Sequence, residues 1–256
     1  MEGKQTLSQL AEKYGVNKST VWRRLKTMRH IRVIPKEKDV VINIDTTYWG
    51  RSLGLMVIKD AFRNKIIWYK FIHHETISDY KEGIEWLRAN DFRIYGIVCD
   101  GLRGLFQELR VYRVQMCQFH QAMIVRRYLT NRPDLPAAQE LLQITKMLAH
   151  TDKESFIGML EQWHQRWYSF LKERSVDRKS GRSTYTHKRI RSAYLSLMRN
   201  MPWLWTFYDY PDLHIPNTNN ALEGIFTDIK TKLRVHSGIS KERRINLIKE
   251  YIARRY

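Results

Sequence analysis

The chain has 256 residues, which is long for one compact domain and short for three, so we expect one large domain with small additions. A hydrophobic content of 43% with 28% charged residues suffices to bury a core and excludes wholesale disorder. The net charge of +19 argues against an ordinary metabolic enzyme and favours a polyanion or an anionic membrane surface as partner. No apolar run approaches the roughly 20 residues of a bilayer span, and no signal peptide opens the chain, so we expect nucleic acid and no membrane. Two cysteines are too few for a disulfide framework and indicate a reducing compartment.

The excess positive charge is concentrated in three segments. Residues 1–36, 172–199 and 230–255 each carry nine Lys or Arg against two acidic residues, a net of +7 per segment. The rest of the chain is nearly neutral, so these segments favour contact with phosphates at several points. Solvated helix faces that keep the chain soluble are the alternative.

Residues 1–34 have the pattern of a helix-turn-helix. Ala11, Gly15 and Val21 have the spacing of this motif, and Gly15 lies where the turn needs a left-handed backbone. Val21 and Leu25 are expected to face inward. The second helix of such a motif enters the major groove, although a plain helical hairpin remains open. Five outward residues of that helix are therefore expected to contact DNA: Lys18, Ser19, Thr20, Arg23 and Arg24.

The next part of the chain predicts a mixed α/β sheet. Three β-rich runs separated by turn signals predict antiparallel strands, and strands and helices then alternate in the order βββαβαβα. The expected strands are 40–47, 53–61, 65–73, 92–99 and 111–116, and the expected helices are 78–90, 102–109 and 121–129. Residues 137–210 lose all strand character and predict an all-helical block, and residues 219–255 are helical again.

Two acidic residues stand where a sheet would present them to a functional crevice. Asp45 lies inside the first β-rich run, where period-two alternation puts it on the face opposite Ile42 and Ile44. Asp100 follows a buried strand, at its carboxyl end. Two ionised carboxylates there favour divalent cations, and two such ions about 4 Å apart would stabilise both oxygens of a phosphoryl displacement. The alternative is that Asp100 caps the next helix and Asp45 binds a loop amide.

Glu223 is the third candidate. It lies in the first turn of a helix that Thr218 or Asn219 can cap, with Asn220 three residues before it on the same face. An acidic residue at this place also complements the helix dipole, so this helix alone does not decide its role.

Taken together, the order of these carboxylates resembles the DDE active site of RNase H-like transposases. Further features are similar to the Mutator-like group and its bacterial insertion-sequence branch. They are the run Cys117-Gln118-Phe119-His120, a helical insertion before Glu223, the approach Asn219-Asn220-x-x-Glu223, and the tail at 232–240 with His236. The resemblance covers roughly residues 37–256.

The resemblance implies an α/β fold in which an RNase H-like mixed sheet is interrupted by an all-α insertion, and the small helix-turn-helix module predicted above precedes it. The expected domains are the helix-turn-helix module at 1–34, the first part of the catalytic domain at 37–130, the insertion at 131–211, and the final helical part at 212–256. It also implies Asp45, Asp100 and Glu223 as catalytic residues and ligands of Mg²⁺, for which Mn²⁺ can substitute.

Other residues are assigned supporting roles. Cys117, His120 and Asn220 are expected beside the active site or against DNA. A zinc site is disfavoured because it needs four ligands and only Cys99 offers another thiolate. A satisfied His120 behind a buried Cys117 remains open. The basic candidates for phosphate contact are Arg126, Arg127, Lys230, Lys232 and Arg234.

The implied activity is metal-dependent cleavage of transposon ends, followed by attack of the freed 3′-hydroxyl on target DNA. The implied partners are double-stranded DNA and further copies of the chain in a homodimer or higher homo-oligomer. We expect a cytoplasmic, nucleoid-associated protein of a prokaryotic cell. The alternatives are a domesticated, non-catalytic DNA-binding regulator and an RNase H-like nuclease or resolvase without strand transfer.

Overall fold

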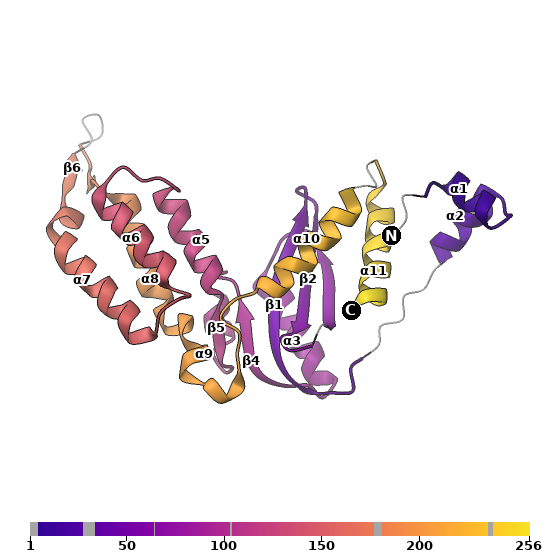
Figure 1. Cartoon of the computed structure of the whole chain (residues 1–256), viewed down its shortest axis with the longest axis horizontal. Coiled ribbons are helices and arrows are strands. Elements are labelled where there is room, and N and C mark those ends of the chain that lie inside the picture. Colours follow the sequence, from indigo (N-terminus) through magenta and orange to yellow (C-terminus); the bar gives the residue numbers. More distant parts are fainter. Residues whose placement is uncertain (1–4, 28–33, 64, 103, 177–180, 235–237) are drawn as a thin grey trace.

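A five-stranded mixed sheet forms the centre of the molecule in a computed structural model, which describes residues 5–27, 34–63, 65–102, 104–176, 181–234 and 238–256 (Figure 1). The strand order is β3-β2-β1-β4-β5. The first three strands pair antiparallel, as predicted, and β4 and β5 run parallel to β1. The strands are β1 (Asp39–Trp49), β2 (Leu53–Asp60), β3 (Ile66–Ile72), β4 (Arg93–Cys99) and β5 (Val114–Met116). The structure thereby confirms the mixed α/β class.

Helices cover both faces of this sheet. Ile42 and Ile44 of β1 point into the main core, where α3 (Ile77–Ala89) packs through Tyr80 and Ile84. On the opposite face lie α10 (Asn220–Arg234), which runs diagonally across the strands in Figure 1, and α11 (Lys241–Arg255). Their buried residues there pack with Leu55, Val57 and Ile66: Leu222, Ile225, Phe226, Ile229, Leu233, Ile248, Tyr251 and Ile252. Alternation in β1 therefore separates two faces, as predicted.

Some predicted boundaries in the sheet region are wrong. The helix expected at 102–109 is only α4 (Leu105–Glu108), and the strand expected at 111–116 is only β5. Val111 is 81% exposed, so the apolar character of this segment does not reflect burial in the sheet. In contrast, α5 (Gln118–Leu129) begins three residues before the predicted start.

A helical block lies beside the sheet, on the side away from α11 (Figure 1). It contains α6 (Pro136–Met147), α7 (Lys153–Lys172), α8 (Lys188–Leu204), α9 (Thr206–Asp209) and the 3-10 turn η1 (Pro211–Leu213). Its interior is aromatic: Trp163 is 2% exposed, and its indole N–H donates to the carbonyl of Ala137 at 2.9 Å.

The prediction that residues 137–210 are entirely helical is wrong in one place. Two short strands, β6 (Arg174–Val176) and β7 (Ser183–Tyr185), pair antiparallel. The Arg174 guanidinium bridges them by donating to the Ser183 hydroxyl at 2.9 Å. Three-residue strands are too short to give a recognisable alternation, which is why the sequence pattern misses them.

The amino-terminal helices α1 (Leu7–Lys13) and α2 (Lys18–Thr27) lie apart from the sheet in Figure 1. Gly15 takes the left-handed conformation expected in the turn, with φ of 59°. Val21 is buried as predicted. Leu25 is 36% exposed, so its inward prediction is wrong, because a two-helix unit has too little interior to bury every apolar side chain.

Within the described residues, no helix combines the length and the apolar character that crossing a membrane requires.

Candidate metal centre

Asp45 occupies the middle of the sheet. It lies on the central strand β1 opposite Val57, and only 6% of its surface is exposed. One carboxylate oxygen, Oδ1, accepts a hydrogen bond from the backbone N–H of Thr46 at 2.7 Å. Burial, and then the neighbouring charges of Asp100 and Glu223, raise the pKa of Asp45 to about 8. The hydrogen bond from Thr46 thus compensates the ionised form of this acid only in part.

Asp100 follows the last residue of β4, at the carboxyl end of that strand. Its Oδ1 atom is buried and has no hydrogen-bond partner among the described residues. Burial raises the pKa of Asp100, while the nearby His120 and Arg127 oppose the rise. An unpaired buried carboxylate oxygen beside a second buried acid is costly unless a cation joins them.

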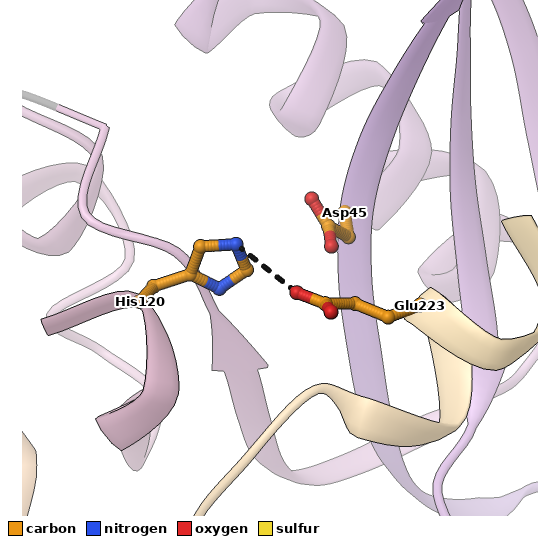
Figure 2. A group of neighbouring side chains, drawn as sticks. All are labelled: Asp45, His120 and Glu223. Carbon is orange, nitrogen blue, oxygen red and sulfur yellow. Dashed lines mark ion pairs between the residues drawn. The ribbon is translucent and has the colours of Figure 1, made fainter. Parts of the chain in front are cut away.

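Glu223 and His120 complete the centre from two helices. Glu223 lies in the first turn of α10, and His120 is the third residue of α5. Their closest atoms, His120 Nε2 and Glu223 Oε1, are 3.5 Å apart. One ligand atom each from Asp45, His120 and Glu223 lie within 4.8 Å of one another. Figure 2 shows the three side chains pointing toward one another from β1, α5 and α10.

The closest grouping therefore differs from the predicted set of three carboxylates. Asp100 does not belong to the three-residue group within 4.8 Å, although its charge is the largest one raising the pKa of Asp45. His120, predicted to lie beside the site or against DNA, offers a nitrogen to this three-residue group. Asp45, Asp100 and Glu223 as a complete ligand set stay a prediction.

Asn219 fixes the start of α10 against the central strand. It is completely buried, and its side-chain amide donates to the carbonyl of Ile44 at 3.0 Å. Its side-chain oxygen accepts a hydrogen bond from the Asn43 amide at 2.6 Å. Its backbone carbonyl accepts from the N–H groups of Leu222 and Glu223 at the start of the helix. From its sequence position Asn219 is predicted as a helix cap and as part of the run Asn219-Asn220-x-x-Glu223, with no assigned contact with the central strand. The available signal was Asn43, a residue type rare in strands.

Cys117 connects the start of α5 to the start of α10. Its sulfur accepts a hydrogen bond from the Asn219 N–H at 3.2 Å, and burial raises the pKa of the thiol to about 11. The backbone N–H of Gln118 donates to the Asn217 carbonyl at 2.9 Å beside it. Since Cys117 is fully buried, it positions the two helices and does not contact DNA.

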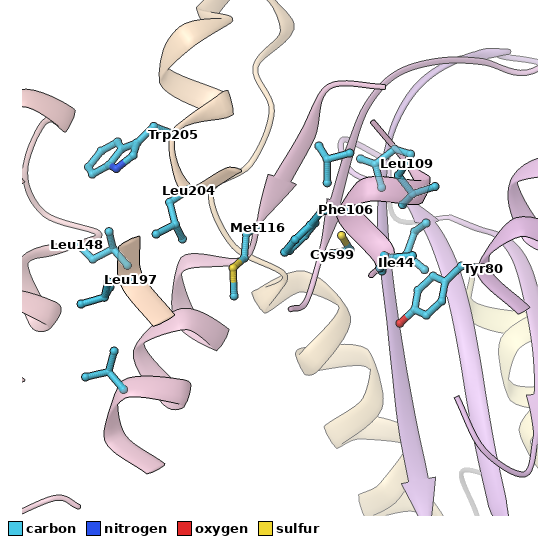
Figure 3. Close-up of a cluster of buried hydrophobic side chains, with 14 of the residues drawn as sticks. Ile44, Tyr80, Cys99, Phe106, Leu109, Met116, Leu148, Leu197, Leu204 and Trp205 are labelled. Atoms are coloured by element: carbon cyan, nitrogen blue, oxygen red, sulfur yellow. The ribbon is translucent and has the colours of Figure 1, made fainter. Parts of the chain in front are cut away.

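Cys99, the other thiol considered for zinc, is also fully buried. Figure 3 shows it in the hydrophobic core with Ile44 and Phe106. Across the part of the chain that the structure describes, Asp45, His120 and Glu223 are the one group of His, Cys, Asp or Glu with metal-binding geometry. Neither cysteine belongs to it.

Glu75 is an acidic neighbour to which sequence reasoning assigned no role. Burial raises its pKa, and the charge of Asp100 raises it further. The hydroxyl of Tyr80 donates a hydrogen bond to its carboxylate. Glu75 lies directly before the residue that caps α3, Thr76, and this position after a sheet strand was the available signal.

The predicted DNA-contacting residues occupy several surfaces. On α2, Lys18, Ser19, Arg23 and Arg24 are exposed and Thr20 is half-buried. Near the metal centre, Asn220, Arg126 and Arg127 are exposed, and further along α10 Lys230 and Arg234 are exposed while Lys232 is half-buried. His236 of the tail motif lies outside the described residues.

The residues of the centre fit a divalent cation. Carboxylate oxygens suit Mg²⁺ and Mn²⁺, whereas an imidazole nitrogen suits Mn²⁺ better than Mg²⁺. The raised pKa of Asp45 and the unpaired Asp100 Oδ1 indicate repulsion and desolvation that a bound cation would relieve.

The amino-terminal module matches a known family of DNA-binding domains. Residues 1–30 match the Psq domain, a helix-turn-helix family. A helix-turn-helix places its second helix in the major groove, so this module is of a DNA-binding type, as predicted. No curated protein matches the chain.

Among solved structures, the chain is similar to the cryo-EM structure of the simian T-cell lymphotropic virus intasome in complex with PP2A regulatory subunit B56 gamma. The identity is 12% and the TM-score 0.25, over 57% of this chain and 69% of that chain.

Proposed function

We propose that the chain is a DDE-type transposase of the Mutator-like superfamily, in its bacterial insertion-sequence branch. In this proposal it cleaves transposon ends and joins the freed 3′-hydroxyl to target DNA. The observation that carries the proposal is the convergence of Asp45, His120 and Glu223 within 4.8 Å, from three elements far apart in the sequence. A Psq-type helix-turn-helix in the same chain supports DNA as the substrate.

The acidic residues and the histidine of the site differ in how far they are exposed to solvent. Asp45 is buried and Asp100 half-buried at the floor of the site, and a bound cation would favour the ionised form of both. Glu223 is 37% exposed and His120 24%, so they lie at the side from which a phosphodiester approaches. A bound Mg²⁺ or Mn²⁺ would supply Lewis acidity toward the attacking and leaving oxygens. Water and the 3′-hydroxyl serve as nucleophiles, so no covalent protein intermediate is needed.

Positive charge on α5 supports the same substrate. Arg127 is exposed and lies near enough to Asp100 to oppose the rise in its pKa. A guanidinium at this position suits a phosphate oxygen next to the scissile bond. Arg126, the preceding residue, is also exposed.

Cleavage of DNA carrying the sequences that flank the gene for this chain tests the proposal. In Mg²⁺ or Mn²⁺, wild type should cut at the element's ends and give joined products with target DNA. Asp100→Asn and Glu223→Gln should cut at least 100-fold more slowly, because each change removes about 3 kcal/mol of transition-state stabilisation. Variants that cut as well as wild type would refute the site. Cut ends without joined products would identify a nuclease or resolvase, and DNA binding without any cutting a regulator.

A further inference from the structure

A pocket of about 850 Å³ lies against the starts of α5 and α10, the two helices that carry His120 and Glu223. Its walls come from α5, from the second half of α6 with the turn that follows, and from the start of α10. This size is typical of pockets that enclose a ligand of nucleotide dimensions.

The pocket and the candidate metal centre lie on the same two helices, α5 and α10, although none of the three residues of the centre lines the pocket. Phe119 lies in its lining and immediately precedes His120, with the two rings in edge-on contact at 5.9 Å between centroids. Asn220 also lines it, three residues before Glu223 on the same helix. A ligand that follows the starts of α5 and α10 would therefore span the pocket and the cluster of Asp45, His120 and Glu223.

The lining combines an apolar interior with positive charge. Its apolar members include Phe119, Ala122, Leu142, Ile144, Leu148 and Met159. Arg126 and Lys146 also line it, both are exposed, and the lining contains no Asp or Glu. Phe119 itself is 40% exposed, although its ring is large and apolar.

These features select a ligand with a flat apolar part attached to an anionic part. Nucleic acid offers this combination, because each base presents an aromatic face and is linked to phosphates. An acidic peptide would pair with Arg126 and Lys146, but it would not explain the exposed aromatic ring of Phe119 next to His120. A second copy of this strongly basic chain would bring like charge against the same residues.

We propose that this pocket receives one unstacked base of the DNA strand whose phosphodiester lies at the metal centre. Phe119 provides the stacking surface, and Arg126 and Lys146 contact the phosphates next to that base. This inference rests on the proposed function, since it takes DNA as the ligand of the metal centre.

A thermodynamic cycle tests the pocket without requiring catalysis. Binding of a DNA end is measured in Ca²⁺ for wild type and Phe119→Ala, with an abasic site placed in turn at each position around the cleavage point. Phe119→Ala should weaken binding of intact DNA by about 5- to 150-fold, the usual worth of one stacked base. At one position the abasic site should weaken wild-type binding but leave the binding of Phe119→Ala nearly unchanged.

Two further variants separate this role from a folding defect. Phe119→Trp keeps a flat ring and should restore both the affinity and its dependence on that base. Phe62→Ala removes a ring that is 56% exposed and absent from the pocket lining, so it should bind like wild type. Additive losses at every position, or failure of Phe119→Trp to restore the coupling, would overturn the pocket proposal. Coupling without cleavage would instead uphold the pocket and count against the transposase.

Discussion

The sulfur of Cys117, just before α5, accepts a hydrogen bond from the backbone N–H of Asn219, just before α10, at 3.2 Å. His120 follows Cys117 by three residues and Glu223 follows Asn219 by four, so each lies about one helical turn beyond this contact. The contact therefore sets the distance between the two side chains that approach Asp45 from the helices. It gives the Cys-x-x-His run a structural explanation without zinc.

Replacing Cys117 tests this positioning role. Cys117→Ala leaves the buried Asn219 N–H without an acceptor, which should cost about 1–3 kcal/mol in the free energy of unfolding. The same change should weaken Mn²⁺ binding, because His120 and Glu223 lose their common anchor. Urea unfolding and calorimetric titration with Mn²⁺ measure the two effects. Cys117→Ser keeps an acceptor and should lie between wild type and Cys117→Ala; if Cys117→Ala matches wild type in both measurements, the contact does not position the centre.

The amide pair of Asn43 and Asn219 should behave as one unit. Each side chain is almost completely buried and each is a partner of the other, so Asn43→Ala or Asn219→Ala leaves a buried polar group unpaired. Each single change should destabilise the fold by about 1–3 kcal/mol, and the double change by clearly less than the sum. Urea unfolding of the four proteins gives the coupling energy. A coupling energy of zero would contradict the pairing.

Sequence patterns predict the strands of the sheet and its antiparallel part because these signals are local, although they misplace the start of β5. The alternation with Ile42 and Ile44 predicts the face of β1 that carries Asp45, and Gly15 predicts the turn between α1 and α2. Two-residue and helical periods are properties of neighbouring residues, so they need no knowledge of the tertiary fold.

The parts that were missed depend on contacts between distant segments. The Asn219 side chain bonds to the carbonyl of Ile44, 175 positions away, and nothing local distinguishes this role from helix capping. His120 reaches the centre only because Cys117 and Asn219 meet. The order of the motifs identifies the candidate residues, but tertiary contacts determine which of them lie closest to one another.

The pKa of Asp45 predicts a pH dependence of stability in the metal-free protein. Its pKa rises from 3.8 to about 8, so the folded chain holds this proton more tightly than the unfolded chain. The stabilisation is complete below the unfolded pKa and is lost as the pH rises through the folded value. Thermal unfolding with a chelator should therefore show Tm falling toward about pH 8, and Asp45→Asn should reduce this fall and melt several degrees higher at that pH.

Asp134→Asn is a suitable control for that measurement. Asp134 is exposed on the segment before α6, so this change should leave the pH profile nearly as in wild type. If Asp45→Asn shows the same decline in Tm as wild type, the pKa of Asp45 is not raised by burial beside Asp100.

Divalent cations should stabilise the fold through the same residues. At 100 times the dissociation constant, binding adds about 2.7 kcal/mol, which corresponds to an increase in Tm of roughly 5–10 °C for a chain of this length. His120→Ala should reduce the effect of Mn²⁺ more than that of Mg²⁺, because imidazole favours Mn²⁺. Glu223→Gln should reduce both. Thermal melts over a series of cation concentrations measure these effects, and equal stabilisation of wild type and Glu223→Gln would exclude Glu223 as a ligand.

The basic face of α2 predicts a specific salt dependence of DNA binding. Arg23 and Arg24 are both exposed, and each phosphate neutralised contributes about 0.9 to the slope of log K against log salt concentration. Arg23→Ala with Arg24→Ala should therefore reduce that slope by about 1.8 if each contacts one phosphate. Arg166→Ala provides the matched control, since Arg166 is 63% exposed on α7 and pairs with Glu140 at 3.0 Å. A loss of slope as large in Arg166→Ala as in the double variant would show that general charge, and not the helix-turn-helix, determines the binding.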